Sequence, residues 1–418
     1  MIGLCDCNNF FVSCERVFNP SLNGKPVLVL SGNDGCVIAR SNETKALGIK
    51  MGTPIFQMKD IIEKNNIQLF STNFSLYGDM SMRVMNTLKQ YTPAIEVYSI
   101  DESFLDFSQF PLESLKGNGE KIAKIVHKNT GIPVSIGIAP SKTLAKIASK
   151  LCKQYPALKG ACLLYKDKDI EKVLGRFPIE DVWGIGRRYT KMLKEFQVFT
   201  ALDFFNCSPD WVENKMSIVG LRTWKELHGQ SCISFDHTLP DKQTICVSRS
   251  FSRDVEDLDE IKAAVSKFTT TIAMKLRKQR SCAGQITIYI MTNRFREDKP
   301  QMFQSFPIKL EVPTNSTLEL VKIAVSTIDK IYRKGYGYKK AGVIVSDLHS
   351  SNNIQLSLFD KVDRNKHSKL MQTLDGINSR RGRDTVTLAS SDKKLSVKSE
   401  HISNRFTTSW DEIIDVKV

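Results

Sequence analysis

Acidic residues follow two predicted strands in the first part of this chain, and they limit the folds that it can adopt. Residues 95–100 and 103–107 are rich in β-forming side chains, so Asp101 and Glu102 fall at the turn between two strands. Asp6 comes directly after a short apolar run, which is typical of a buried strand. Three carboxylates at strand ends suit a site that holds two Mg²⁺ ions about 3.5 to 4 Å apart for phosphoryl or nucleotidyl transfer. An acidic pair in an ordinary surface turn is the alternative.

The composition favours a globular protein with a polyanionic partner. A chain of 418 residues with 41% hydrophobic and 25% charged residues has room for several domains, each with its own core. The formal net charge of +15 favours nucleic acid as a partner, and a merely basic soluble protein is the alternative. No charged leader precedes an apolar stretch, and no run approaches the roughly 20 apolar residues of a membrane span. We therefore expect a cytoplasmic protein.

The cysteines and histidines do not predict a zinc site. The ten Cys are scattered without the paired C-x-x-C spacing of such sites, and the six His form no cluster. We expect the cysteines to be reduced and mostly buried. A hard cation with oxygen ligands is the metal chemistry that remains.

The first 165 residues alternate strand and helix patterns. This alternation predicts an α+β layer of the split βαβ kind, with helices on one face of a sheet that carries all three carboxylates. The predicted strands are residues 2–7, 26–30, 95–100, 103–107 and 133–139, and the predicted helices are residues 76–91, 115–129 and 141–152.

Residues 31–78 contain several Gly and Pro positions, which predict a small insertion of short elements. Within it, Arg40, Asn42 and Lys45 are candidate contacts for a triphosphate, and a solvated helix face is the alternative. Phe11 follows Asp6 closely. It is either a core residue or an aromatic ring that lies under the sugar of a bound nucleotide and excludes a 2′-hydroxyl group.

The chain turns helical from residue 170. Gly184 and Gly186 precede an amphipathic run, and a Gly-x-Gly turn that opens a helix presents backbone N–H groups to a phosphate. With Arg187 and Arg188 attached, the pattern resembles a helix-hairpin-helix that binds a DNA backbone. An ordinary turn between two helices is the alternative.

A second α+β domain follows a linker at residues 229–243. Its predicted strands are residues 245–251, 285–291 and 341–347, and its predicted helices are residues 258–280 and 316–334. This domain is rich in basic residues, among them Arg249 and Arg253, and it therefore predicts a second contact with a nucleic acid duplex.

An ordered set of motifs resembles that of the Y-family DNA polymerases, and the likeness runs essentially from end to end. The chain is most similar to the UmuC-type branch of this family. The motifs that carry the resemblance are residues 6–15 (DCNNFFVSCE), 33–40 (NDGCVIAR), 98–102 (YSIDE), 135–139 (SIGIA) and 181–186 (DVWGIG).

The resemblance implies an α+β multidomain fold, namely a right-hand polymerase that carries out translesion synthesis in the SOS response without proofreading. A ferredoxin-like palm would span residues 1–165, with small fingers inserted at about 11–78. A helical thumb with the helix-hairpin-helix would span 166–235, and an α+β little finger would span 243–350. Residues 351–418 would form a clamp-binding motif and a UmuC-type C-terminal tail.

The resemblance also implies residue roles. Asp6, Asp101 and Glu102 would ligate two Mg²⁺ ions, with the Cys7 carbonyl as an added ligand, and Phe11 would be the steric gate. The residues implied for the nucleotide are Cys36 and Ile38 over the nascent base pair, and Lys45 and Lys153 on the triphosphate. Many relatives bind the triphosphate with a Tyr and an Arg at the positions where this chain has Asn42 and Lys45. Arg40 would therefore help Asn42 and Lys45 to bind the triphosphate here. Lysine keeps the charge of arginine but not its bidentate fork.

The pentapeptide Gln355, Leu356, Ser357, Leu358 and Phe359 looks like the sliding-clamp motif of bacterial members of this family. A piece of ordinary helix or strand is the alternative. By resemblance the further partners are a processed UmuD-type dimer and a RecA filament, in a bacterial cytoplasm and on the nucleoid when the enzyme is active. A catalytically silent DNA-binding scaffold and a nucleotidyl cyclase with a similar palm are the competing functions.

Overall fold

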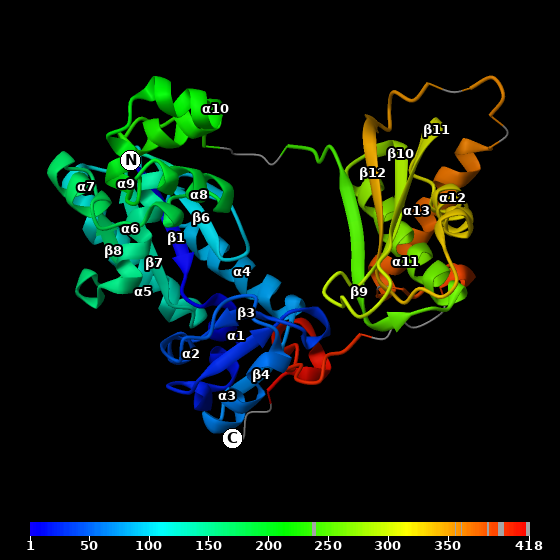
Figure 1. The fold of residues 1–418 in the computed structure, drawn as a ribbon, viewed down its shortest axis with the longest axis horizontal. Coiled ribbons are helices and arrows are strands. Elements are labelled where there is room, and N and C mark those ends of the chain that lie inside the picture. Colours follow the sequence, from blue (N-terminus) through cyan, green and yellow to red (C-terminus); the bar gives the residue numbers. More distant parts are fainter. Residues whose placement is uncertain (236–239, 356, 361, 383, 392–396, 415–418) are drawn as a thin grey trace. The chain divides into compact units, whose positions relative to one another are not determined.

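The structure is a computed structural model that describes residues 1–235, 240–355, 357–360, 362–382, 384–391 and 397–414. The chain forms two compact units (Figure 1). Unit 1 is Met1–Leu239 together with Glu400–Val418, and unit 2 is Pro240–Ser399.

The central sheet of unit 1 has the strand order β5-β6-β1-β7-β8. Its strands are β5 (Ile95–Val97), β6 (Glu102–Asp106), β1 (Ile2–Cys7), β7 (Val134–Ala139) and β8 (Ala161–Leu163). Strand β1 lies in the middle and pairs antiparallel with both β6 and β7. The strand predicted at 95–100 ends earlier, at Val97, and the other strands predicted for this sheet are confirmed within two residues.

Helices cover both faces of this sheet, so the predicted one-sided layer was wrong. Helices α4 (Phe74–Leu88) and α5 (Leu115–Thr130) share a core with Cys5 of β1, whereas α6 (Lys142–Gln154) shares a different core with the adjacent Leu4. Successive side chains of a strand point to opposite faces, so the two cores lie on opposite sides of β1. The buried side of a helix is visible in the sequence, but the face of the sheet that it covers is not.

A second sheet in unit 1 has the order β3-β2-β4. Its strands are β3 (Val37–Arg40), β2 (Val27–Leu30) and β4 (Gln68–Ser71), and nearby lie the helices α1 (Phe10–Phe18), α2 (Asn42–Ala46) and α3 (Lys59–Lys64). Strand β2 pairs antiparallel with β3 and parallel with β4. A small separate core lies beneath this sheet, and residues 31–78 do form short elements. The strand predicted at 26–30, however, is part of this second sheet and not of the central one.

The helical part of unit 1 contains α7 (Asp167–Leu174), α8 (Arg187–Glu195), α9 (Ala201–Phe205) and α10 (Pro209–Leu227). It shares its core with α6. Gly184 has a φ of +95°, and a Cβ added there would lie 2.6 Å from Thr223 Oγ1 of α10. The turn before α8 therefore requires glycine both for its backbone conformation and for its close approach to α10.

Unit 2 has a sheet with the order β11-β10-β12-β9, in which all neighbouring strands are antiparallel. Its strands are β9 (Ile245–Val255), β10 (Ser281–Thr292), β11 (Phe303–Thr314) and β12 (Tyr338–Ser350), and its helices α11 (Leu258–Lys278) and α12 (Thr317–Ile331) pack together in the same core. Strand β11 was not predicted, because its first five residues are exposed and it contains Pro307. Such a residue pattern is typical of an edge strand.

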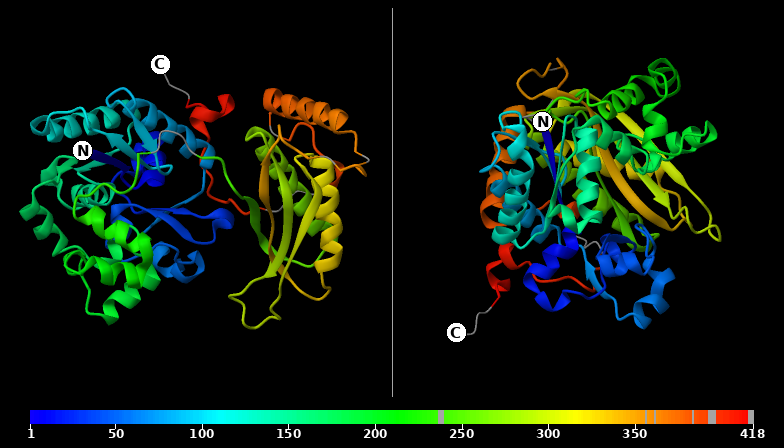
Figure 2. Two further views of the ribbon diagram at one scale, coloured as in Figure 1. Left: turned by 90° about the horizontal axis from the view of Figure 1, so that it is seen from above. Right: turned by 90° about the vertical axis from the view of Figure 1, so that its left-hand side faces the viewer.

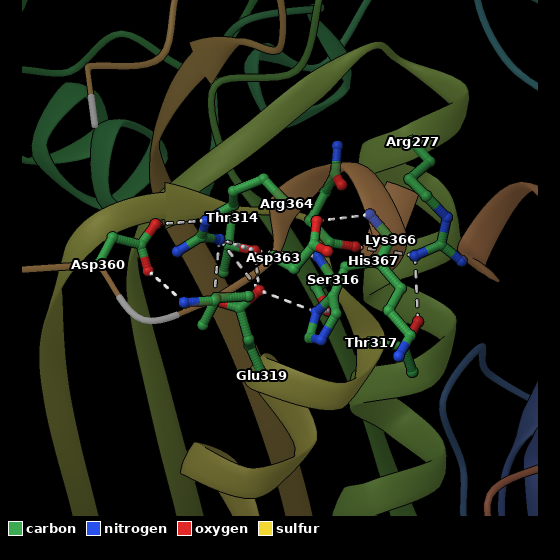
Figure 3. A network of polar contacts seen from close by, with 12 residues as sticks. Arg277, Thr314, Ser316, Thr317, Glu319, Asp360, Asp363, Arg364, Lys366 and His367 are labelled. Atoms are coloured by element: carbon green, nitrogen blue, oxygen red, sulfur yellow. Dashed lines mark hydrogen bonds and ion pairs between the residues drawn. The ribbon is translucent and has the colours of Figure 1, made fainter. Parts of the chain in front are cut away.

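Helix α13 (Arg364–Arg381) belongs to unit 2, where ion pairs anchor it (Figure 3). The Arg364 guanidinium lies 2.9 Å from Glu319 of α12 and 2.7 Å from Asp360. Arg277 of α11 makes two parallel bonds to Asp375, at 2.6 and 2.7 Å. Paired bonds of this kind fix the direction of the side chain as well as its distance.

The residues from Glu400 onward belong to unit 1, so the region expected as one C-terminal part, 351–418, is divided between both units. They contain the 3₁₀ helices η8 (Phe406–Thr408) and η9 (Trp410–Glu412). In Figure 2 this red segment lies against the blue part of unit 1. The other 3₁₀ helices are η1 (Pro20–Leu22), η2 (Gly32–Asp34), η3 (Ile55–Met58), η4 (Leu112–Ser114), η5 (Pro156–Leu158), η6 (Ile179–Asp181) and η7 (Ala389–Ser391).

Among the described residues, no helix combines the length and the apolar character that crossing a membrane requires.

Candidate active site

The strand register brings the predicted acidic residues together. Asp6 is the direct partner of Glu102 across the antiparallel pair of β1 and β6. The next residue, Cys7, donates its N–H to the Asp101 carbonyl at 2.8 Å, so Asp101 lies beside the same end of β1. Directly opposed residues in an antiparallel pair have Cβ atoms only about 4.5 to 5.5 Å apart. Glu102 is therefore the first residue of a strand in the central sheet, and Asp101 lies directly before it, beside the end of β1.

Two lysines of α6 pair with these acids. Lys153 Nζ lies 2.6 Å from Asp6 Oδ1, and Lys146 Nζ lies 2.9 and 3.1 Å from the two oxygens of Glu102. The Lys146 ammonium also lies 4.4 Å from the centre of the Tyr98 ring. Asp101 accepts a hydrogen bond from the Ser99 hydroxyl. These contacts hold each of the three acids in place.

Sequence reasoning identified Lys153 but missed Lys146. A signal was present, because Lys142, Lys146, Lys150 and Lys153 recur every three or four residues, which places them along one stripe of α6. Lys142, which is only 1% exposed, bonds to Glu96 of β5 at 2.6 Å, so three lysines of this stripe pair with acids of the central sheet. Lys150 instead pairs with Asp181.

The pKa of Asp6 indicates that the negative charge of this carboxylate is only partly compensated in the structure. Burial raises the pKa of Asp6 to about 6, although the neighbouring Lys153 opposes this shift. The negative charges of Glu102 and Asp101 raise the pKa of Asp6 further. The single lysine thus does not fully compensate the buried carboxylate, and a cation of higher charge would be attracted to it.

The donor chemistry of the site suits a hard divalent cation. Carboxylate and carbonyl oxygens are the ligands that Mg²⁺ prefers. Within the part of the chain that the structure describes, no three Asp, Glu, His or Cys side chains are already arranged as a ligand set. Asp6 and Glu102 are instead turned toward Lys153 and Lys146, so a bound cation would replace lysine contacts that are present here.

The candidate triphosphate residues of α2, Asn42 and Lys45, lie near these acids. Asn9, which has a left-handed backbone with φ +47°, donates to the Asn42 side chain at 3.0 Å and accepts from Lys45. Burial lowers the pKa of Lys45, the charges of Lys153 and Arg40 lower it further, and Asp6 raises it. Lys45 and Lys153 therefore lie close enough to repel each other. A group of cations that repel one another favours a bound anion.

Two further predicted nucleotide residues, Ile38 and Arg40, lie in β3 of the second sheet, and a third, Cys36, lies directly before that strand. Arg40 donates to the Ile49 carbonyl, and its buried Nε has no hydrogen-bond partner among the described residues. Ile38 is partly buried against the main core, and Cys36 is half-buried and pairs with Pro54 in an isolated bridge.

The two neighbouring aromatics after β1 have different environments. Phe10 is 4% exposed and belongs to the core, whereas Phe11 is half-buried. The Phe11 ring stacks on Tyr77 of α4, with ring centres 4.5 Å apart and planes 16° apart, and meets Phe74 edge-on at 6.0 Å. Phe11 is thus a partly exposed ring that two other rings support, and sequence reasoning did not identify Tyr77.

The residues predicted to bind DNA or the sliding clamp lie in other parts of the chain. Gly186 caps the N-terminus of α8, where the exposed Arg187 and Arg188 begin the helix. In unit 2, Arg249 is exposed on β9 and Arg253 pairs with Glu260 at 2.6 Å. In the clamp-like peptide, Gln355 is exposed, and Leu358 and Phe359 are 101% and 83% exposed. Leu356 lies outside the described residues.

Comparison with protein families identifies most of the chain. Residues 5–150 match the impB/mucB/samB family, and residues 242–358 match the impB/mucB/samB family C-terminal domain. Residues 368–416 match a domain of unknown function, DUF4113. Together the first two matches contain the three acidic residues of the candidate active site and the sheet of unit 2.

Relatives and solved structures agree with these matches. The chain is 38% identical to Protein UmuC of Salmonella typhimurium, with full coverage of both chains, and 28% identical to DNA polymerase IV 1 of Halalkalibacterium halodurans over 97% of this chain and 96% of that protein. It superposes on a Y-family DNA polymerase chimera of Dbh and Dpo4 with a TM-score of 0.66 and 23% identity, covering 83% of this chain and 99% of that one. The fold is therefore that of the Y-family DNA polymerases, and the chain belongs to the impB/mucB/samB family.

Proposed function

We propose that this chain synthesises DNA by two-metal nucleotidyl transfer at Asp6, Asp101 and Glu102. It is a DNA-directed DNA polymerase that carries out translesion synthesis in the SOS response to DNA damage, as its UmuC-type and DNA polymerase IV relatives indicate. One observation carries the site assignment: Asp6 lies opposite Glu102 in the sheet, and lysines from two separate elements approach the same edge.

Three side chains and one carbonyl would hold the metal ions. Asp6, Asp101 and Glu102 with the Cys7 carbonyl supply the oxygen ligands for two Mg²⁺. When bound, the ions lower the pKa of the primer 3′-hydroxyl group and stabilise the pyrophosphate that leaves. The high pKa of Asp6 reflects a carboxylate that is buried before any such cation is bound.

Lys45 and Lys153 bind the triphosphate in this proposal. Their mutual repulsion in the free protein is relieved when an anion lies between them. Lys153, which pairs with Asp6 in the free protein, would bond to a phosphate oxygen when the triphosphate is bound. Asn42 bonds to the same Asn9 that accepts from Lys45, so it orients the lysine, and Arg40 adds positive charge nearby.

Phe11 acts as the steric gate for the sugar. It is the partly exposed ring of the pair after β1, and its support by Tyr77 would resist displacement by a 2′-hydroxyl group. Cys36 and Ile38 of the neighbouring sheet contact the nascent base pair.

DNA is held outside the active site by two groups of residues. Gly184, Gly186, Arg187 and Arg188 present helix N–H groups and charge to a backbone phosphate. Arg249 and Arg253 on β9 of unit 2 make the second contact. We propose, on the strength of the similarity to UmuC, that the active polymerase is associated with the bacterial nucleoid.

Partner proteins complete the proposal. The Gln355–Phe359 peptide binds the sliding clamp, and the exposure of Leu358 and Phe359 supports this because an exposed apolar pair is suited to docking in a cleft. A processed UmuD-type dimer and a RecA filament are the remaining proposed partners, on the strength of the similarity to UmuC.

The first test is primer extension with Mg²⁺ by the wild type and by Asp101→Ala with Glu102→Ala. The control is Glu63→Ala with Glu113→Ala, which removes the same charge from exposed positions. Clamp, activated RecA and the processed UmuD-type partner are added if the chain alone is silent. Extension that only the active-site variant loses supports the proposal. DNA binding by a wild type that never extends a primer would instead favour the silent scaffold.

A further inference from the structure

The last described residues of the chain attach to unit 1 through specific bonds. We call residues 400–412 the C-terminal segment. At the end of the edge strand β4, Ser71 donates its N–H to the His401 carbonyl at 2.9 Å, and His401 donates its N–H to the Ser71 hydroxyl at 3.0 Å. The Glu400 N–H bonds to a carboxylate oxygen of the buried Asp34 at 2.8 Å. The segment therefore covers the end of β4 in one defined register.

The segment is also bound to the first turn of α4. Asn73 caps this helix by accepting the Leu76 N–H at 3.3 Å. The amide nitrogen of the same Asn73 donates to the carbonyls of Ser403 and Asn404, at 3.2 and 3.0 Å. One buried side chain thus joins the start of α4, which carries Phe74 and Tyr77, to the segment.

A buried carboxylate connects the segment to the interior. Glu15 of α1 is 2% exposed, and its Oε1 accepts hydrogen bonds from the Tyr77 hydroxyl at 2.6 Å and from the Ser403 hydroxyl at 3.0 Å. Burial raises the pKa of Glu15, and these two bonds oppose the shift. A buried carboxylate is costly unless donors surround it, so the Ser403 hydroxyl has an energetic role.

The same network reaches Phe11. Tyr77, held at its hydroxyl by Glu15, carries on its ring the stacked Phe11 at 4.5 Å. A second aromatic contact fixes the segment at its other end, where Phe406 stacks on Phe18 of α1 with ring centres 4.5 Å apart and planes 6° apart. The path from Ser403 to Phe11 thus runs through two residues, and each step is a direct contact.

We propose that the C-terminal segment positions the sugar gate: Ser403 orients Glu15, Glu15 orients Tyr77, and Tyr77 supports Phe11. Ser403 is in this view a positioning residue that never touches the nucleotide. The inference rests on the proposed role of Phe11 as the steric gate. It assigns a role in substrate selection to the last part of a region that otherwise matches a domain of unknown function.

The test measures incorporation of single deoxyribonucleotides and ribonucleotides by full-length variants, together with their melting temperatures. Ser403→Ala should reduce discrimination against ribonucleotides about 3- to 10-fold, the effect of one hydrogen bond. Ser403→Thr retains a hydroxyl group and should restore discrimination. Tyr77→Phe breaks the network from its other side while it keeps the stacked ring, so it should reproduce the effect of Ser403→Ala.

Two control variants separate an effect on the sugar gate from a general effect on the stability of the C-terminal segment. Trp410→Ala alters the same segment at a side chain that is 90% exposed, and it should leave discrimination unchanged. Phe11→Ala tests the gate itself and should raise ribonucleotide incorporation strongly. In the double variant, Ser403→Ala should add nothing to Phe11→Ala, because it acts through the ring that has been removed.

The outcomes distinguish the two proposals. Unchanged sugar discrimination in Phe11→Ala would overturn the gate and with it this inference. Relaxed discrimination in Phe11→Ala but not in Ser403→Ala or Tyr77→Phe would overturn the inference alone. An equal loss in Trp410→Ala, or an additive loss in the double variant, would also overturn it, because the segment would then act by a general effect on stability.

Discussion

Replacement of Gly137 by alanine should both destabilise unit 1 and impair its active site. Gly137 lies in β7, where α6 passes directly over the strand. A Cβ added at this position would lie 2.1 Å from the Ser149 nitrogen and 2.2 Å from the Ala145 carbonyl oxygen, both backbone atoms of α6. Ordinary van der Waals contact begins near 3.4 Å, so the whole helix would have to move away by about 1 Å.

The expected cost is at the upper end of that for overpacked cores, about 3 kcal/mol or more, because backbone atoms cannot rotate away as a side chain can. This is a large part of the roughly 5 to 15 kcal/mol that stabilises a typical domain. The same displacement would move Lys146 and Lys153, which pair with Glu102 and Asp6. We therefore expect reduced primer extension even at temperatures where the variant is folded.

Urea unfolding and primer extension of Gly137→Ala and of Gly117→Ala provide the assay. Gly117 lies in α5 with nothing within 4 Å of an added Cβ, so alanine should be neutral or stabilise by up to about 1 kcal/mol there. The reasoning fails if Gly137→Ala unfolds at the wild-type urea concentration, or if the two variants lose equal stability.

Three further predictions concern the partner site, the triphosphate and a buried acid. The double variant Leu358→Ala with Phe359→Ala should lose stimulation by the sliding clamp but keep basal synthesis. Clamp pull-down and primer extension would test this, and unchanged clamp binding would contradict the prediction. Lys153→Ala should raise the KM for deoxynucleotides about tenfold or more, as expected for a charged hydrogen bond, whereas Lys150→Ala, which lies on the same helix, should not. For Glu15, burial raises the pKa above the ordinary 4.5, so its ionisation destabilises the fold as pH rises through that raised pKa. The melting temperature of Glu15→Gln relative to that of the wild type should therefore increase as the pH rises. A difference between the two proteins that does not change with pH would contradict this.

The sequence predicted the elements that bring the acids together because their signals are local. The apolar run before Asp6 and the two β-rich runs around Asp101 are complete within a few residues. Antiparallel pairing of such runs then places the acids opposite each other, as the register of Asp6 and Glu102 confirms. Asn42 and Lys45 were predicted from their polar and basic side chains and again from the family resemblance, but their link through Asn9 has no local signal.

The features that were missed depend on long-range contacts. The amphipathic pattern of α6 showed a helix, but only the close approach at Gly137 decides which face of the sheet it covers. The bonds of Ser403 to Glu15 and to Asn73 join residues more than 300 positions apart and involve small polar side chains that are common in loops. No periodic pattern predicts such contacts, because each depends on a single atom pair in the folded chain.

The packing of α6 on the sheet determines how the negative charges of the active-site acids are compensated. Three neighbouring carboxylates would repel one another in a metal-free protein, and Lys146 and Lys153 supply the compensating charge for two of them. They can do so only because Gly137 allows their helix to lie directly on the sheet. The compensation at Asp6 is incomplete, since its pKa remains near 6 despite Lys153. The lysines of α6 thus hold Asp6 and Glu102 in place but leave the charge of Asp6 partly uncompensated, and this remaining charge would attract a cation in the proposed mechanism.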